Sequence, residues 1–269
     1  MKDLFNKELA LKEKKLWLFD MDGTVYLGNT LFDGVIELLS NIEKSGGRYV
    51  FITNNSSKSV KDYIAKVTKM GIKANKDNFF TSASCAVMIL KEKFSNDLIY
   101  AQGTKSFIKQ LKKSGLNITT EYNENTKCVI VGFDTEITGK KLENTCKTLK
   151  LDVKYFATNP DWVCPVEFGY IPDCGSMCQG IERATGKAPE FIGKPKPTMI
   201  YEVMKKFGAT KDQTVVLGDR LYTDIMSGVN AGVDTVFVLS GEATLEDYKV
   251  SEEKPTYVLN HVKQINEIF

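Results

Sequence analysis

The sequence predicts an α/β protein with a parallel central sheet and a second α/β domain inserted into the chain. Short apolar runs alternate with amphipathic helical patterns at both ends of the chain, and this alternation is typical of parallel sheets covered by helices. Residues 84–188 carry strand and helix patterns of their own. Because a βαβ crossover needs only about 30 residues, we expect this middle stretch to form a separate domain.

The N-terminal part of the chain begins the alternation. Its first two apolar runs have strand length, and each ends in a polar residue, Asp20 after the first and Thr53 after the second. Gly71 marks the end of a helical pattern, as glycine does at many helix C-termini. The expected elements are strands at 15–19, 48–52 and 79–80 and helices at 34–44, 60–69 and 82–93.

The alternation returns near the C-terminus, and the middle of the chain adds its own strands. We therefore expect a core domain made of residues 1–83 and 189–269 and an inserted α/β domain made of residues 84–188. The expected C-terminal elements are strands at 191–192, 214–217, 235–238 and 256–258, helices at 198–206 and 222–231, and a last helix. The expected middle strands lie at 98–100, 128–131 and 153–156.

Composition narrows the classes of function. The 269 residues include 36 Lys and Arg against 34 Asp and Glu, a net charge of +2, so the chain lacks the basic surplus of nucleic-acid-binding proteins. No apolar run is long enough for a membrane span, and the first 15 residues do not resemble a secretory signal. We expect a cytoplasmic protein with neither a nucleic-acid nor a membrane partner. A homo-oligomer remains possible.

Histidine and cysteine offer little for catalysis. The one histidine, His261, lies near the C-terminus, and the sequence therefore does not favour a Ser-His-Asp or Cys-His catalytic arrangement. The six cysteines are scattered and lack the paired spacing of a structural zinc site, so we expect mostly buried thiols. Any hydrolytic chemistry must then come from carboxylates and a metal ion.

Two aspartates follow the first predicted strand, in Asp20-Met21-Asp22-Gly23-Thr24. Residues i and i+2 of a strand point to the same side, and the carboxyl end of a parallel strand is where ligands bind in open α/β sheets. Like charges so close resist joint ionisation unless a cation joins them, and Mg²⁺ prefers such carboxylate ligands. The alternative is that Asp20 and Asp22 only cap a turn.

Polar residues also follow three other predicted strands. Each has a simpler alternative: Thr53 and Asn54 as a helix cap, Lys194 as a solvated lysine, and Asp224 as a first-turn helix charge. Together, however, the strand ends supply a carboxylate pair, a hydroxyl, an ammonium and further carboxylates at one edge of the sheet, which suits a phosphoryl group and a cation. The residues are Thr53 and Asn54 after the second strand, Lys194 in Gly193-Lys194-Pro195, and Asp219 and Asp224 in 218–224.

With these motifs the chain resembles the haloacid dehalogenase (HAD) superfamily of phosphohydrolases, and within it the NagD and 4-nitrophenylphosphatase-like branch. The branch is indicated by Thr53-Asn54-Asn55-Ser56, Gly193-Lys194-Pro195, Thr158-Asn159-Pro160-Asp161 and Gly218-Asp219-Arg220. The resemblance covers nearly the whole chain after about residue 14. It implies a Rossmann-like core sheet with an inserted cap domain over the site.

The resemblance also implies a role for each motif residue. Asp20 would be the nucleophile that forms an aspartyl phosphate, and Asp22 would act as general acid and then as general base. The metal, Mg²⁺, would be bound by Asp20, the backbone carbonyl of Asp22, and Asp219, with Asp224 in support. The phosphoryl oxygens of a small phosphorylated metabolite would be held by Thr53, the N–H of Asn54, and Lys194, which is chosen over Lys196 on the family pattern.

In the cap, the loops 158–162 and 171–176 are the expected substrate-facing segments, although ordinary turns would have the same composition. We expect Trp162 to pack in the core of the cap. Two other functions stay open. A receiver-type phospho-aspartate switch needs neither Asp22 nor a cap, and a metal-independent haloacid dehalogenase has no use for Asp219.

Overall fold

The computed structural model describes residues 1–166 and 168–269. The described chain divides into two compact units, and each is built from separate stretches of sequence. Unit 1 consists of Met1–Thr53, Ile64–Phe80 and Lys194–Phe269, and unit 2 of Asn54–Tyr63 and Thr81–Gly193. The assignment of a core at 1–83 and 189–269 and a cap at 84–188 stays a prediction.

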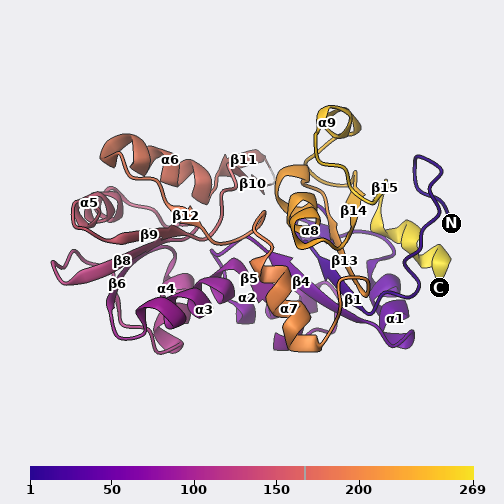
Figure 1. Ribbon diagram of the computed structural model, residues 1–269, viewed down its shortest axis with the longest axis horizontal. Coiled ribbons are helices and arrows are strands. Elements are labelled where there is room, and N and C mark those ends of the chain that lie inside the picture. The colour runs from indigo at the N-terminus through magenta and orange to yellow at the C-terminus, as the bar shows by residue number, and fades with distance from the viewer. Residues whose placement is uncertain (167) are drawn as a thin grey trace. The chain divides into compact units, whose positions relative to one another are not determined.

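Unit 1 is organised around a six-stranded sheet in the order β15-β14-β13-β1-β4-β5 (Figure 1). Strand β1 (Leu16–Phe19) lies between β4 (Arg48–Thr53) and β13 (Thr214–Gly218) and pairs with both in parallel. The other strands are β5 (Phe79–Thr81), β14 (Asp234–Val238) and β15 (Tyr257–Leu259). All four residues of β1 and all five of β13 are buried, which explains their continuous apolar sequences.

The helices of unit 1 bury one face, as their periodic sequences predict. In α7 (Thr198–Phe207) the buried residues Met199, Ile200, Val203 and Met204 form a stripe with helical spacing. The other elements are β2 (Tyr26–Leu27), β3 (Thr30–Leu31), α1 (Val35–Lys44), η1 (Lys76–Asn78), η2 (Leu221–Ile225), α8 (Met226–Ala231), α9 (Leu245–Val250) and η3 (Val262–Ile268). Helix α2 (Val60–Lys69) contains residues of both units.

Unit 2 has a five-stranded sheet in the order β12-β9-β8-β6-β7, whose paired strands run parallel. Apolar residues of its strands and of the helices α5 (Gly139–Thr148) and α6 (Cys174–Thr185) contribute to one core cluster, whose buried members include Tyr100, Phe133 and Ile181. Its elements are α3 (Ser82–Phe94), β6 (Leu98–Gln102), α4 (Lys105–Lys113), β7 (Ile118–Thr119), β8 (Thr126–Val131), α5 (Gly139–Thr148), β9 (Lys154–Ala157), β10 (Val163–Val166), β11 (Gly169–Pro172), α6 (Cys174–Thr185) and β12 (Glu190–Phe191).

The segment 54–63 belongs to unit 2, and several of its hydrogen bonds are to other residues of that unit. Ser56 Oγ lies 2.9 Å from Thr158 Oγ1 and accepts the backbone N–H of Phe133 at 2.9 Å. The Thr104 hydroxyl donates to the Ser57 carbonyl at 2.8 Å. These bonds attach a stretch that directly follows β4 to residues just beyond the strands β6, β8 and β9 of unit 2.

The predicted α/β class with a parallel sheet is confirmed, with local corrections. The helix expected at 222–231 starts as a π-helical turn, η2, and the last helix is the 3₁₀-helical η3. Trp162 was expected in the core, and this was wrong: its side chain is 52% exposed. All six cysteines are thiols, and four of them are buried. Among the described helices, none combines the length and the apolar sequence that crossing a bilayer requires. The cytoplasmic location stays a prediction.

Candidate active site

The strand register of unit 1 aligns the predicted site residues at one edge of the sheet. Phe19 pairs with Leu217 on one side and with Phe51 on the other, so the chain leaves all three strands at the same level. The backbone N–H of Asp20 continues this register by donating to the carbonyl of Leu217 at 2.8 Å. Asp20, Thr53 and Asp219 therefore lie at neighbouring strand ends.

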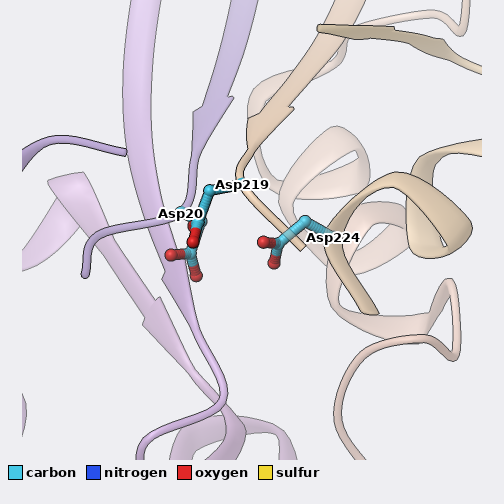
Figure 2. A group of neighbouring side chains, drawn as sticks. All are labelled: Asp20, Asp219 and Asp224. Atoms are coloured by element: carbon cyan, nitrogen blue, oxygen red, sulfur yellow. The ribbon is translucent and has the colours of Figure 1, made fainter. Parts of the chain in front are cut away.

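Three carboxylates converge at this edge. Asp20, Asp219 and Asp224 each offer one oxygen, and these oxygens lie within 4.8 Å of one another. Figure 2 shows Asp224 pointing toward the other two carboxylates. The donor set consists entirely of carboxylate oxygens, which are the ligands that Mg²⁺ prefers. The residues present therefore fit a magnesium ion, and we refer to them below as the carboxylate cluster.

Lys194 lies between two members of the carboxylate cluster. Its ammonium is 2.5 Å from Oδ1 of Asp20 and 2.5 Å from Oδ1 of Asp224, and it also donates to the Ile52 carbonyl at 3.2 Å. Lys194 is buried, whereas Lys196 is exposed. Of the two lysines that the sequence offered, the structure places Lys194 beside the carboxylates.

Asp219 is held in place by donors and by two glycines. It accepts the Thr24 hydroxyl at 3.1 Å and the Glu242 backbone N–H at 2.7 Å. A Cβ at Gly23 would lie 2.4 Å from Asp219 Oδ2, and one at Gly241 only 1.9 Å from the same atom. Gly23 also has a φ of +93°, a conformation that side chains with a Cβ rarely adopt. The chain therefore closes around Asp219 only because both positions are glycine.

The electrostatics of the carboxylate cluster favour a cation. Burial, and then the charge of Asp224, raise the pKa of Asp219 from 3.8 to about 7. Burial and the same neighbour raise the pKa of Asp20 well above its ordinary value, even though Lys194 acts to lower it. Burial alone would lower the pKa of Lys194, but Asp20 and Asp224 raise it. A divalent cation among these carboxylates would offset the repulsion that hinders their ionisation.

Asp224 owes its position to the π-helical turn η2. The backbone N–H of Ile225 donates to the Arg220 carbonyl at 3.1 Å, five residues back, and the Arg220 N–H donates in turn to Asp224 Oδ2 at 3.1 Å. Asp224 is 1% exposed, so it is not an ordinary solvated charge of a helix's first turn. π-turns of this kind are frequent at functional sites.

Asp22 lies outside the carboxylate cluster. Its side chain accepts the Tyr26 hydroxyl at 3.3 Å, and its other oxygen lies 3.7 Å from the Lys66 ammonium. The side chains of Asp20 and Asp22 thus have separate surroundings although they are two residues apart. The role of the Asp22 backbone carbonyl as a metal ligand stays a prediction.

The predicted phosphate-binding pair divides between the units. Thr53 is the buried last residue of β4 in unit 1. Asn54 is the first residue of unit 2. Its side-chain amide donates to Asp161 at 2.9 Å, and its backbone carbonyl accepts the Ser82 hydroxyl at 2.5 Å. The role of the Asn54 backbone N–H in phosphate binding stays a prediction.

The two expected substrate-facing loops of unit 2 are joined by buried hydrogen bonds. The Asn159 amide donates to Asp161 at 2.7 Å and to Asp173 at 2.9 Å. Asp173 also caps helix α6 by accepting the Cys174 N–H at 2.5 Å. These side chains hold the loops to each other, and the exposed Trp162 is the last residue of the first loop. A substrate-facing role for the loops stays a prediction.

Sequence reasoning missed the residues that hold the aspartates. Thr24, which donates to Asp219, is part of the first motif, so a signal for it was present in the sequence. Glu242 contributes through its backbone N–H, and no side-chain pattern identifies such a donor. Lys66 lies on a helix far along the sequence from Asp22 and carried no motif.

Comparisons with known proteins identify the family. The acid sugar phosphatase of Staphylococcus haemolyticus is 32% identical over 247 residues, which cover 92% of this chain and 93% of that protein. Residues 17–117 match the family of haloacid dehalogenase-like hydrolases, and residues 191–265 match a HAD-hydrolase-like family. The chain belongs to the haloacid dehalogenase-like hydrolases.

Solved structures of HAD hydrolases have the same fold. The 4-nitrophenylphosphatase from Thermotoga maritima superposes with a TM-score of 0.91 at 36% identity and covers 97% of this chain and 99% of its own. The glycerol phosphate phosphatase from Mycobacterium tuberculosis, solved in complex with magnesium, gives a TM-score of 0.88 at 27% identity over 99% of this chain and 78% of its own. The predictions of a HAD phosphatase and of the NagD and 4-nitrophenylphosphatase branch are thereby confirmed.

Proposed function

We propose that this HAD phosphatase depends on Mg²⁺ and hydrolyses small phosphomonoesters, 4-nitrophenyl phosphate among them, through an aspartyl phosphate on Asp20. The carboxylate cluster with Lys194 at its side is the observation that carries the proposal. Carboxylates and an ammonium that share one buried edge of a sheet can bind a cation and an anion side by side. Acid sugar and glycerol phosphate phosphatases among the relatives support a small phosphorylated metabolite as substrate.

The cation would be held by Asp20, Asp219 and the backbone carbonyl of Asp22, with Asp224 supporting the site. When bound, Mg²⁺ supplies positive charge that offsets the negative charge on the phosphoryl oxygens. The presence of magnesium in the related glycerol phosphate phosphatase supports this choice of metal. Lys194 adds a fixed cation that favours the ionised form of Asp20 and that we expect to contact the incoming phosphoryl group.

The reaction proceeds in two steps on this chain's own residues. An Asp20 carboxylate oxygen attacks phosphorus, and the bond from phosphorus to the leaving oxygen breaks. That oxygen keeps the bonding electron pair and takes a proton from the Asp22 carboxyl group. Asp22, now ionised, accepts a proton from water, whose oxygen attacks the phosphorus of the aspartyl phosphate. This second attack releases phosphate and restores Asp20.

The remaining residues bind and orient the phosphoryl group. The Thr53 hydroxyl and the Asn54 backbone N–H are short donors at the end of β4, and together with Lys194 they suit its oxygens. Holding the reactants in this way contributes about 7–11 kcal/mol in well-oriented systems. Uncatalysed phosphomonoester hydrolysis is so slow that enzymes accelerate it by up to about 10²¹-fold, so positioning has to be combined with charge stabilisation and a covalent route.

Steady-state phosphate release tests the proposal. We expect the purified protein to release phosphate over many turnovers from 4-nitrophenyl phosphate, to lose this activity with EDTA, and to regain it with added Mg²⁺. A single stoichiometric phosphorylation without turnover would favour the receiver-type switch. Activity that EDTA leaves unchanged would contradict the metal dependence and favour a metal-independent enzyme. A panel of sugar, glycerol, nucleotide and cofactor phosphates then identifies the preferred substrate.

A further inference from the structure

The side chain of Asp22 is contacted at both of its carboxylate oxygens. The Tyr26 hydroxyl donates to Oδ2 at 3.3 Å, and the Lys66 ammonium lies 3.7 Å from Oδ1. Both distances are long for hydrogen bonds, so these groups restrict the orientation of Asp22 without binding it as tightly as Lys194 binds Asp20. The side chains of Asp22 and Lys66 are 27% and 16% exposed, so water alone does not determine their positions.

Lys66 is itself held by Tyr26. Its ammonium lies 3.7 Å from the centre of the Tyr26 ring, within the range of a cation–π interaction. Tyr26 is fully buried, and its carbonyl accepts the Gly23 N–H at 2.8 Å, which attaches it to the loop that carries Asp22. Asp22, Tyr26 and Lys66 therefore form a closed triangle of mutual contacts.

This triangle is separate from the carboxylate cluster. Lys66 comes from helix α2, within the part of that helix that belongs to unit 1. Lys194 contacts Asp20 and Asp224, whereas Lys66 forms an ion pair with Asp22. Each of the two aspartates of the first motif thus has a lysine beside it: Lys194 beside Asp20, the proposed nucleophile, and Lys66 beside Asp22, the proposed proton donor.

We propose that Lys66 is a positioning residue that, together with Tyr26, orients the carboxyl group of Asp22 for proton transfer to the leaving oxygen. The proposal rests on the proposed function, in which Asp22 donates that proton as the bond from phosphorus to the leaving oxygen breaks. A carboxyl group whose plane is fixed presents its proton in one direction. Misplacement by about 1 Å can cost about 100-fold in rate.

The proposal predicts a dependence on the leaving group. 4-Nitrophenolate leaves readily as an anion and needs little help from a proton, whereas an alkoxide has to be protonated as it leaves. Loss of Lys66 should therefore slow the hydrolysis of alkyl phosphates much more than that of 4-nitrophenyl phosphate. A role in phosphate binding or in folding would instead lower both rates together.

The experiment compares kcat/KM for 4-nitrophenyl phosphate, phenyl phosphate and glycerol phosphate at saturating Mg²⁺. The value of kcat/KM depends only on the steps up to the phosphorylation of Asp20. The later hydrolysis of the aspartyl phosphate is common to all three esters and does not affect the comparison. In Lys66→Met the charge is removed while an apolar stem remains over Tyr26. We expect a loss of about 10-fold or more with glycerol phosphate and of less than about 3-fold with 4-nitrophenyl phosphate.

Three further variants complete the test. Lys66→Arg should retain most of the glycerol phosphate activity that Lys66→Met loses. Tyr26→Phe, which removes only the hydroxyl, should lower kcat/KM for glycerol phosphate relative to that for 4-nitrophenyl phosphate, as Lys66→Met does. Lys69→Met, at an exposed position on the same helix, should match the wild type with every ester. If Lys66→Met does not fold, Tyr26→Phe and Lys66→Arg decide the question.

The positioning role would be overturned if kcat/KM fell equally for all three esters. It would also be overturned if kcat/KM for glycerol phosphate relative to 4-nitrophenyl phosphate stayed unchanged in both Lys66→Met and Tyr26→Phe. Failure of the proposed function gives a different result, because the wild-type protein itself would then release no phosphate from any ester in the presence of Mg²⁺.

Discussion

The ammonium of Lys194 lies 2.5 Å from a carboxylate oxygen of Asp20, although 174 positions separate the two residues in the chain. The proposed nucleophile is thus paired with a cation from the third sequence segment of unit 1, Lys194–Phe269. An ionised, correctly oriented carboxylate is what attack on phosphorus requires. The contact with Lys194 restricts the orientation of Asp20 and favours its ionised form.

Replacing Asp20 by Asn should abolish turnover and leave the fold intact. The substitution keeps the shape of the side chain but removes the nucleophilic oxygen, and we expect kcat with 4-nitrophenyl phosphate to fall by at least about 10³-fold. Phosphate release measures the activity, and circular dichroism and a cooperative melting curve measure the fold. Asp212→Asn, at an exposed position of the same unit, serves as the control. Substantial activity in Asp20→Asn would contradict the assignment.

Mg²⁺ should stabilise the protein more at high pH than at low pH. Without metal, folding raises the pKa of Asp219 from 3.8 to about 7, so the folded state binds more protons than the unfolded state between these values. The contribution of Asp219 to stability is complete below pH 3.8 and falls as the pH rises through about 7. Mg²⁺ binds the ionised carboxylate, so its effect has the opposite dependence on pH.

Melting temperatures with and without Mg²⁺ check this prediction. The increase in Tm on adding Mg²⁺ should grow between about pH 5.5 and about pH 8.5. In Asp219→Asn, which cannot ionise at this position, the increase should be small at every pH. An increase that is equally large at both pH values in the wild-type protein would refute the linkage.

Gly23→Ala should impair the site as well as the stability. At φ +93° an alanine costs about 1–2 kcal/mol, and its Cβ would also press on the Asp219 carboxylate. Gly46→Ala is a matched control because Gly46 has a similar φ of +78° with nothing within 4 Å of an added Cβ. We expect comparable backbone costs in urea unfolding, but a loss of Mg²⁺ affinity and activity only in Gly23→Ala. Equal activity in the two variants would show that the close contact with Asp219 is unimportant.

The two tryptophans should differ sharply in their contribution to stability. Trp162 is 52% exposed, whereas Trp17 in β1 is fully buried. Trp162→Ala should change the free energy of unfolding by less than about 0.5 kcal/mol, and Trp17→Ala should lower it by about 3–5 kcal/mol. Urea unfolding measures both changes. A large loss in Trp162→Ala would mean that this side chain is buried in solution.

The sequence was informative where chemistry follows directly after a strand. Asp20, Thr53 and Asp219 each follow a continuous apolar run, and parallel strands bring such positions to one edge, so this arrangement could be predicted from the sequence. The pairing of Lys194 with Asp20 followed from the family pattern, because the two lysines 194 and 196 could not be distinguished by their spacing alone.

Other features depend on tertiary contacts that leave no local pattern. The π-helical turn at Leu221–Ile225 differs from an α-helical turn by one hydrogen-bond step, which helical periodicity does not resolve. The donor from Glu242 to Asp219 is a backbone N–H, which any residue except proline provides. Trp162 was predicted to be buried from its large apolar area alone, and the surroundings of one side chain override such a preference.

The order of the strands has a consequence for how the chain is made. β1 lies next to β13 in the sheet but precedes it by almost 200 residues, while every strand of the five-stranded sheet has been synthesised by Phe191. On the ribosome, the inserted unit has all of its strands before the other unit has its central pair. Until the C-terminal segment emerges, the edge of β1 that later pairs with β13 has no partner strand. Unpaired strand edges promote aggregation. Asp20, the proposed nucleophile, is therefore translated early, but the strand beside it, β13, is translated almost 200 residues later.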